Sequence, residues 1–118
     1  MASKGLPIAE VDEIPPGGVK LVRVNGIEIG VFRTPGGYAA VKNVCPHMGA
    51  PLCLGRVTGT FAPSRPQEYS WVREGEILRC PWHAWEFDLL TGEALHVPGK
   101  RVKTYRVTVE DQRVVLHV

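Results

Sequence analysis

Two short segments of this 118-residue chain each place a cysteine and a histidine within three residues of one another. The first is CPHMGAPL at 45–52, and the second is CPWHAWEFD at 80–88. The first pair has the spacing C-x-H and the second C-x-x-H, with residues 48–79 between them. A fold in which the four side chains meet must therefore hold both segments as tight loops, side by side.

The candidate metal ligands are the four side chains of these pairs, Cys45, His47, Cys80 and His83. Pro46 and Pro81 directly follow the two cysteines and stiffen both turns, because proline fixes φ. Gly49 allows the first loop to fold back on itself. Two matched Cys-Pro/His loops are a poor fit to the alternative in which these residues are merely buried in turns.

Two kinds of metal centre use two cysteines and two histidines. Zinc takes this ligand set in closed tetrahedral structural sites. Iron–sulfur clusters usually take four cysteines, but in one class of [2Fe–2S] centre two histidines replace two cysteines on one iron. The ligand types alone leave both metals open.

The rest of the chain has the alternation of β-strands, and no segment of helical period is long enough to predict a helix. Asn25-Gly26 suits the type I′ turn of a hairpin, and the residues after it alternate as on half-buried strands. We predict an all-β antiparallel sandwich or small barrel that carries a subdomain of two loops. The expected strands are 8–11, 19–24, 27–33, 38–44, 76–80, 86–88, 105–110 and 114–118.

The composition is that of one globular domain, expected over residues 1–118. Hydrophobic residues make up 44% of the chain and charged residues 22%, and 13 glycines with 10 prolines fit many turns between short strands. The stretch 56–76 lies between the two loops, and we interpret it as an exposed loop or hairpin inserted there. It either helps to decide partner choice or is a harmless surface insertion.

Charge and hydropathy indicate neither a nucleic-acid-binding nor a membrane protein. The net charge is +2, no apolar run approaches the length of a membrane span, and the N-terminus lacks the pattern of a secretory signal. Three cysteines, an odd number, fit a reducing compartment, so we expect a soluble, cytoplasmic protein. One group of cations is interpreted as a solvated face or as a docking patch for an acidic partner: Lys100, Arg101, Lys103 and Arg106.

The paired loops closely resemble those of the Rieske [2Fe–2S] family, which read C-x-H-x-G and C-P-x-H. The match covers CPHMGAPL (45–52) and CPWHAWEFDLLTGE (80–93), and the flanking strands extend it over most of the chain. The resemblance implies one [2Fe–2S] cluster, with one iron bound by cysteines and the other by histidines. The implied ligands are Cys45 and Cys80 for the first iron, and His47 and His83 for the second.

The resemblance also implies a low redox potential. High-potential Rieske proteins of the cytochrome bc complexes carry an extra cysteine in each loop, which form a disulfide, and aim Ser and Tyr hydroxyls at the cluster and its ligand. The matching positions here are Ala50, Trp82, Trp85 and Phe87. Without the disulfide and the hydroxyl donors we expect a potential near the bottom of the Rieske range, as in ferredoxins of bacterial oxygenase systems.

The function implied by this resemblance is electron transfer rather than catalysis. We expect a ferredoxin that takes single electrons from a flavin-dependent reductase and passes them to a terminal oxygenase or similar redox enzyme. The sequence has no Gly-rich nucleotide loop and no second His/carboxylate iron site. Two alternatives stay open: a small subunit of a larger reductase, of the nitrite reductase type, and a zinc-stabilised interaction module without a redox role.

Other conspicuous residues are expected to be structural. Cys53 is expected to be buried, because free cysteine is among the most buried residue types. His96 and His117 lie outside the loops and are expected to be ordinary core or surface residues. Trp82 and Trp85 flank His83, where they either shield the site or pack between the loops and the sheet.

Overall fold

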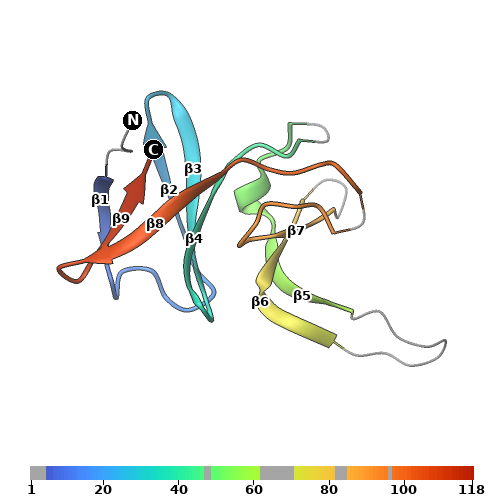
Figure 1. Ribbon diagram of the computed structural model, residues 1–118, viewed down its shortest axis with the longest axis horizontal. Coiled ribbons are helices and arrows are strands. Elements are labelled where there is room, and N and C mark those ends of the chain that lie inside the picture. Colours follow the sequence, from blue (N-terminus) through green and yellow to red (C-terminus); the bar gives the residue numbers. More distant parts are fainter. Residues whose placement is uncertain (1–4, 47–48, 62–70, 82–84, 96) are drawn as a thin grey trace.

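The computed structural model of the protein describes residues 5–46, 49–61, 71–81, 85–95 and 97–118, with the backbone alone described at 60, 61 and 71. These residues form nine strands and a short 3₁₀ helix, in two antiparallel sheets (Figure 1). The all-β prediction is confirmed. Within the described residues no helix is long and apolar enough to cross a membrane.

Six strands form the larger sheet, in the order β1-β9-β8-β4-β3-β2. Strand β8 pairs with β4 only at Ala40↔Tyr105 and Val41↔Thr104, then pairs with β9 along most of its length. The two edge strands, β1 and β2, are also linked: the Lys20 Nζ of β2 donates to the Ile8 carbonyl of β1 at 2.6 Å. The sheet therefore curls into a near-barrel. The strand bounds are β1 Gly5–Glu10, β2 Val19–Val24, β3 Ile27–Thr34, β4 Gly37–Lys42, β8 Thr104–Glu110 and β9 Arg113–His117.

Local sequence explains the hairpins of this sheet. Asn25 and Gly26 have φ of 51° and 79° between β2 and β3, and a type I′ turn requires positive φ at both positions. Asp111 and Gln112, with φ of 51° and 62°, join β8 to β9. Apolar residues of these strands fill the inside of the curl, together with Ile14 from the connection between β1 and β2. The strand residues are Ala9, Ile29, Val31, Ala40, Val114 and Leu116.

Three strands form the smaller sheet, in the order β5-β6-β7. Their bounds are β5 Arg56–Phe61, β6 Trp71–Arg79 and β7 Glu86–Asp88, and the 3₁₀ helix η1, Leu52–Leu54, precedes them. Strands β5 and β6 pair from Arg56↔Arg79 to Phe61↔Trp71, so the described part of the stretch 56–76 is a hairpin rather than an open loop. Residues 62–70 lie outside the described residues.

Several predicted bounds were wrong for physical reasons. Strand β6 begins at Trp71 rather than 76, because its first residues pair with β5. The early start of β6 is not evident from its sequence, because Arg73 and Gly75, with φ of 59° and 86°, interrupt the regular strand. Strand β1 begins at Gly5, where pairing with β9 starts. The helix η1 was not predicted.

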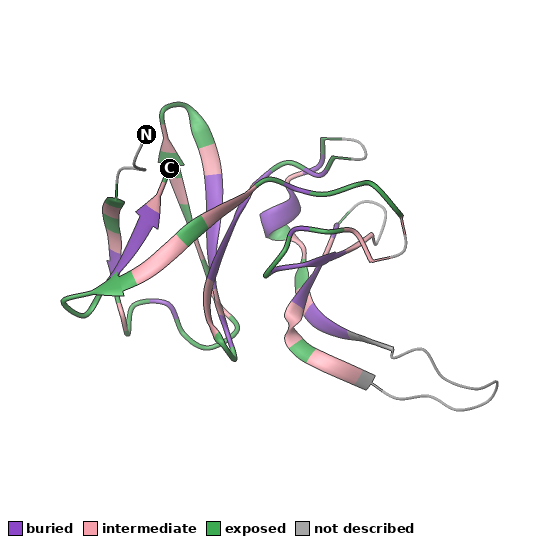
Figure 2. Cartoon of the chain, in the orientation of Figure 1, coloured by how far each residue is buried: buried purple, intermediate pink, exposed green. Residues whose placement is uncertain are grey.

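The two sheets share one layer of buried side chains, which joins residues of β3 and β4 to residues of η1, β6 and β7. Figure 2 shows buried residues along β3, β4 and β9 and again around η1. Gly30 of β3 is buried at the contact with η1. A Cβ atom placed on Gly30 would lie only 2.4 Å from the Sγ of Cys53 and 2.8 Å from its Cβ. The helix can therefore approach the strand this closely only because residue 30 lacks a side chain.

The substitution Gly30→Ala tests this contact. We expect it to lower the free energy of unfolding by about 1–3 kcal/mol, because the added methyl forces η1 away from β3. Urea unfolding followed by tryptophan fluorescence measures the change. Gly36→Ala is the matched control, since a Cβ there would meet nothing within 4 Å. Equal losses in both variants would contradict the close contact.

Candidate metal centre

The same backbone hydrogen bond closes both Cys/His loops. The amide of Cys45 donates to the carbonyl of Ala50 at 2.8 Å, and the amide of Cys80 donates to the carbonyl of Trp85 at 2.8 Å. Donor and acceptor are five residues apart in each case. In the first loop Gly49, with a φ of 76°, also donates to the Cys45 carbonyl at 2.8 Å. The unequal C-x-H and C-x-x-H spacings therefore occur in loops of equal span.

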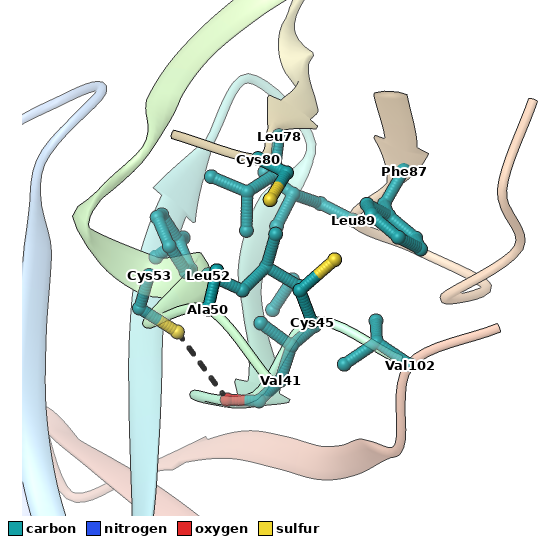
Figure 3. Close-up of a cluster of buried hydrophobic side chains, with 12 residues drawn as sticks. Val41, Cys45, Ala50, Leu52, Cys53, Leu78, Cys80, Phe87, Leu89 and Val102 are labelled. Carbon is teal, nitrogen blue, oxygen red and sulfur yellow. Dashed lines mark hydrogen bonds between the residues drawn. The ribbon is translucent and has the colours of Figure 1, made fainter. Parts of the chain in front are cut away.

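The two loop cysteines lie in one buried apolar cluster. Cys45 is 1% exposed and Cys80 2%, and Figure 3 shows both among the side chains of the common layer. The structure thus brings together two of the four predicted ligands. The other two, His47 and His83, lie outside the described residues. The cluster around the cysteines contains Phe32, Ala39, Val41, Ala50, Leu52, Cys53, Leu78, Phe87, Leu89 and Val102.

The chemistry of this cluster fits the thiolate half of a mixed centre. A thiolate buried among apolar side chains is costly unless a cation compensates it, and iron is bound by thiolates. Within the described residues no three His, Cys, Asp or Glu side chains gather into a possible metal site. A four-ligand centre here therefore needs side chains beyond the two cysteines, as the sequence predicts.

Asn43 braces the base of the first loop. Its Oδ1 accepts from the amide of Cys53 at 2.6 Å, and its Nδ2 donates to Glu28 Oε1 at 2.5 Å. Asn43 is 7% exposed, and its own amide donates to the Glu28 carbonyl at 2.9 Å. The side chain ties the end of the loop to its start and to β3. Sequence reasoning missed Asn43, because an asparagine before a turn is common and its partners come from tertiary contacts.

The base of the second loop is held by a cross-strand ion pair. Arg79 and Glu86 are ladder partners of β6 and β7, and Arg79 Nη2 lies 2.9 Å from Glu86 Oε2. Gly55, just after η1, packs against this base, since a Cβ there would lie 1.9 Å from the Arg79 carbonyl oxygen. The backbone just after the first loop, at Gly55, is thus in contact with the backbone just before the second loop, at Arg79. That contact brings Cys45 and Cys80 into one cluster.

The remaining conspicuous cysteine is structural, as expected. Cys53 is 1% exposed and its Sγ turns away to donate to the Val41 carbonyl at 3.6 Å (Figure 3). Burial raises the pKa of the Cys53 thiol to about 12, so it stays protonated at neutral pH.

The aromatic and histidine residues outside the ligand set also have structural contacts where they are described. Trp85 packs against the cysteine cluster, with its ring centroid 6.3 Å from that of Phe87. His117 lies 2.7 Å from the Thr108 hydroxyl on the neighbouring strand. The contact of His117 agrees with the expected structural role, and that of Trp85 agrees with packing between the loop and the sheet. Trp82 and His96 lie outside the described residues.

Comparison with known proteins gives one family. The model of the Rieske [2Fe–2S] domain matches residues 4–106, which include both loops. A ferredoxin component of naphthalene 1,2-dioxygenase/salicylate 5-hydroxylase systems from a Ralstonia species is 36% identical over 117 residues. The alignment covers 98% of this chain and 97% of that protein.

Solved structures have the same fold. The ferredoxin of carbazole 1,9a-dioxygenase from Nocardioides aromaticivorans is 26% identical, with a TM-score of 0.75 and 97% of each chain covered. A structure described as a nitrite reductase small subunit from Mycobacterium tuberculosis has a TM-score of 0.77 at 23% identity, with 100% of this chain and 97% of that one covered. At that identity the second likeness shows the fold alone.

The substitution Asn43→Ala tests the brace of the first loop. We expect a loss of about 2 kcal/mol in the free energy of unfolding, because the buried amide of Cys53 is left without its acceptor. Chemical unfolding measures the loss. Glu28→Gln is the control, since its amide oxygen can still accept from Asn43 Nδ2 and only the exposed pair with Arg23 is lost, so we expect less than about 1 kcal/mol. A larger loss in Glu28→Gln than in Asn43→Ala would contradict the assignment.

Proposed function

Because the chain belongs to the Rieske [2Fe–2S] domain family, we propose that it is a one-electron carrier, a ferredoxin, and not itself a catalyst. The observation that carries this proposal is the full-length match to a ferredoxin component at 36% identity. The alignment covers 97% of that protein, so almost no part of the relative lacks a counterpart here. Residues 1–118 are proposed to form a single domain.

The proposed ligands are the four residues of the paired loops. Cys45 and Cys80 would hold one iron of a single [2Fe–2S] cluster, and His47 and His83 the other. The buried cysteine pair, the equal spans of the loops and the family match across both loops support this assignment. When bound, such a cluster supplies one-electron redox chemistry at potentials between about −150 and +300 mV.

The chain's own residues position and shield this site. The Cys45–Ala50 and Cys80–Trp85 hydrogen bonds fix where each loop begins and ends. Leu52, Leu78 and Leu89 are at most 1% exposed and keep water from the two thiols. A dry, preformed thiol pair needs little rearrangement when the charge of the site changes, which suits fast electron transfer.

The proposed partners are a flavin-dependent reductase, as electron donor, and a terminal oxygenase or similar redox enzyme, as acceptor. We prefer the electron carrier to the alternative, a small subunit of the nitrite reductase type, because that alternative is supported here by a similarity of fold at 23% identity. No observation specifically favours the zinc-stabilised module. A cytoplasmic location is part of the proposal, since thiol ligands and the free, buried Cys53 suit a reducing compartment.

Electron paramagnetic resonance of the dithionite-reduced protein, purified without air, tests the cluster and its ligands. We expect about two irons per chain and a rhombic signal with an average g value below that of all-cysteine clusters. His47→Ala and His83→Cys should alter or abolish the signal. Cys53→Ser, which changes a cysteine outside the loops, should keep it. Zinc without an iron signal would contradict the proposal.

The midpoint potential of the loaded protein tests the low-potential assignment. Phe87 is 1% exposed within the cysteine cluster and Trp85 packs against it, and neither has a hydroxyl to donate to cluster sulfur. We therefore expect protein-film voltammetry to give a potential near the bottom of the range, about −150 mV. A value near +300 mV would show that other donors compensate.

A further inference from the structure

The segment 94–109 concentrates positive charge that nothing in it balances. It contains no acidic residue and four exposed basic ones, Lys100, Arg101, Lys103 and Arg106. Arg101 lies 3.5 Å from Glu93, whereas the other three form no ion pair within the described part of the chain. Elsewhere cations generally face carboxylates, as do Lys20, Arg23, Arg73, Arg79 and Arg113.

The fold adds a fifth cation to this segment. The amide of Lys42 on β4 donates to the Lys103 carbonyl at 2.9 Å, next to the Val41↔Thr104 pair that begins the pairing of β4 with β8, so the two lysines lie opposite one another just before β8. Like charges directly opposite one another destabilise a sheet. The described partner of the Lys103 ammonium is the ring of Tyr105, 5.8 Å from its centroid, which brings no negative charge. We name the four exposed cations Lys100, Arg101, Lys103 and Arg106 the basic face, which the half-buried Lys42 adjoins.

The surface along the basic face is hollowed. Three shallow hollows follow one another, the first and second sharing Arg101 and the second and third sharing Thr104. Leu90, 56% exposed, lines the third hollow. Basic side chains line all three hollows, with Glu93 as the acidic residue of the first. Basic side chains combined with an exposed leucine favour a surface that receives another polypeptide over a merely solvated one.

The basic face lies just outside the cysteine cluster. Val102 lines the second hollow and Leu89 the third. Both residues also belong to the apolar cluster that contains Cys45 and Cys80, and Figure 3 labels them there. Val102 and Leu89 therefore link the hollows to the apolar cluster that holds the two thiols.

We propose that the basic face docks an acidic surface patch of the protein that exchanges electrons with this chain. The proposal deepens and rests on the proposed function, because closeness to the thiol pair matters only if the site carries an electron. Complementary charge raises the association rate and orients the partner, and the attraction weakens with ionic strength. The chemistry of the partner is thus acidic polypeptide, with carboxylates spaced to meet several cations.

Binding of the iron-loaded protein to poly-L-glutamate, titrated at low and high salt, tests the charge preference. The test variant is Lys100→Gln/Arg106→Gln, which removes two cations without an ion pair in the described structure. The control is Arg23→Gln/Arg113→Gln, which removes two exposed cations from β2 and β9 and changes the net charge equally. We expect about fivefold weaker binding in the test variant and near-parental binding in the control.

Two outcomes would overturn the proposal. Equal weakening in both variants would mean that net charge alone decides binding, and unchanged binding in the test variant would mean that the basic face is not the docking surface. A protein without a reducible cluster would refute the proposed function instead, while the comparison of the two variants could still be made.

A second measurement tests closeness to the redox site. Ferric EDTA, an anion, takes one electron from the reduced protein and becomes ferrous EDTA. We expect the test variant to be oxidised at least about threefold more slowly than the parent at low salt, with the difference lost at high salt. Equal rates at low salt would overturn the placement of docking beside the thiol pair.

Discussion

The packing of Gly55 against the carbonyl of Arg79 is the contact on which the site depends. It joins the exit of one loop to the entry of the other, and so sets two cysteines that are distant in sequence into one apolar cluster. The larger sheet supports this contact from β3, where Gly30 lets η1 approach closely. The smaller sheet supports it from β6 and β7, through the Arg79–Glu86 pair. Both positions need glycine, because a side chain at residue 55 would push the two loops apart and one at residue 30 would push η1 away from β3.

Much of the fold could be predicted because alternation and turn chemistry are local. The β2–β3 and β8–β9 hairpins follow from residues that accept positive φ at the turn. The start of β6 could not be predicted, because Arg73 and Gly75 break the alternation there and pairing with β5 overrides it. The helix η1 was missed for a similar reason, since it is three residues long and is stabilised by tertiary contacts with β3, β4 and β6.

The candidate site also has a part that the sequence predicts and a part that it does not. Spacing in sequence picked out the cysteines of both loops, and the structure buries them together. The supporting residues could not be found from the sequence, since Asn43 acts through Glu28 and Cys53, which come from different elements. Fold alone also leaves the role of the chain undecided, because a carrier and a reductase subunit have similar backbones. Partner choice must therefore reside in surface residues.

The equal span of the two loops has a consequence for how this centre could change. Both loops close with a hydrogen bond across five residues, yet histidine stands second after the cysteine in one and third in the other. The closing hydrogen bond thus does not fix where, within the five residues that it spans, a histidine stands. If the proposed ligand set is right, one backbone frame accommodates two different histidine positions. Very few substitutions within such a frame would then change the ligand types that the site offers to a metal, in evolution or in the laboratory.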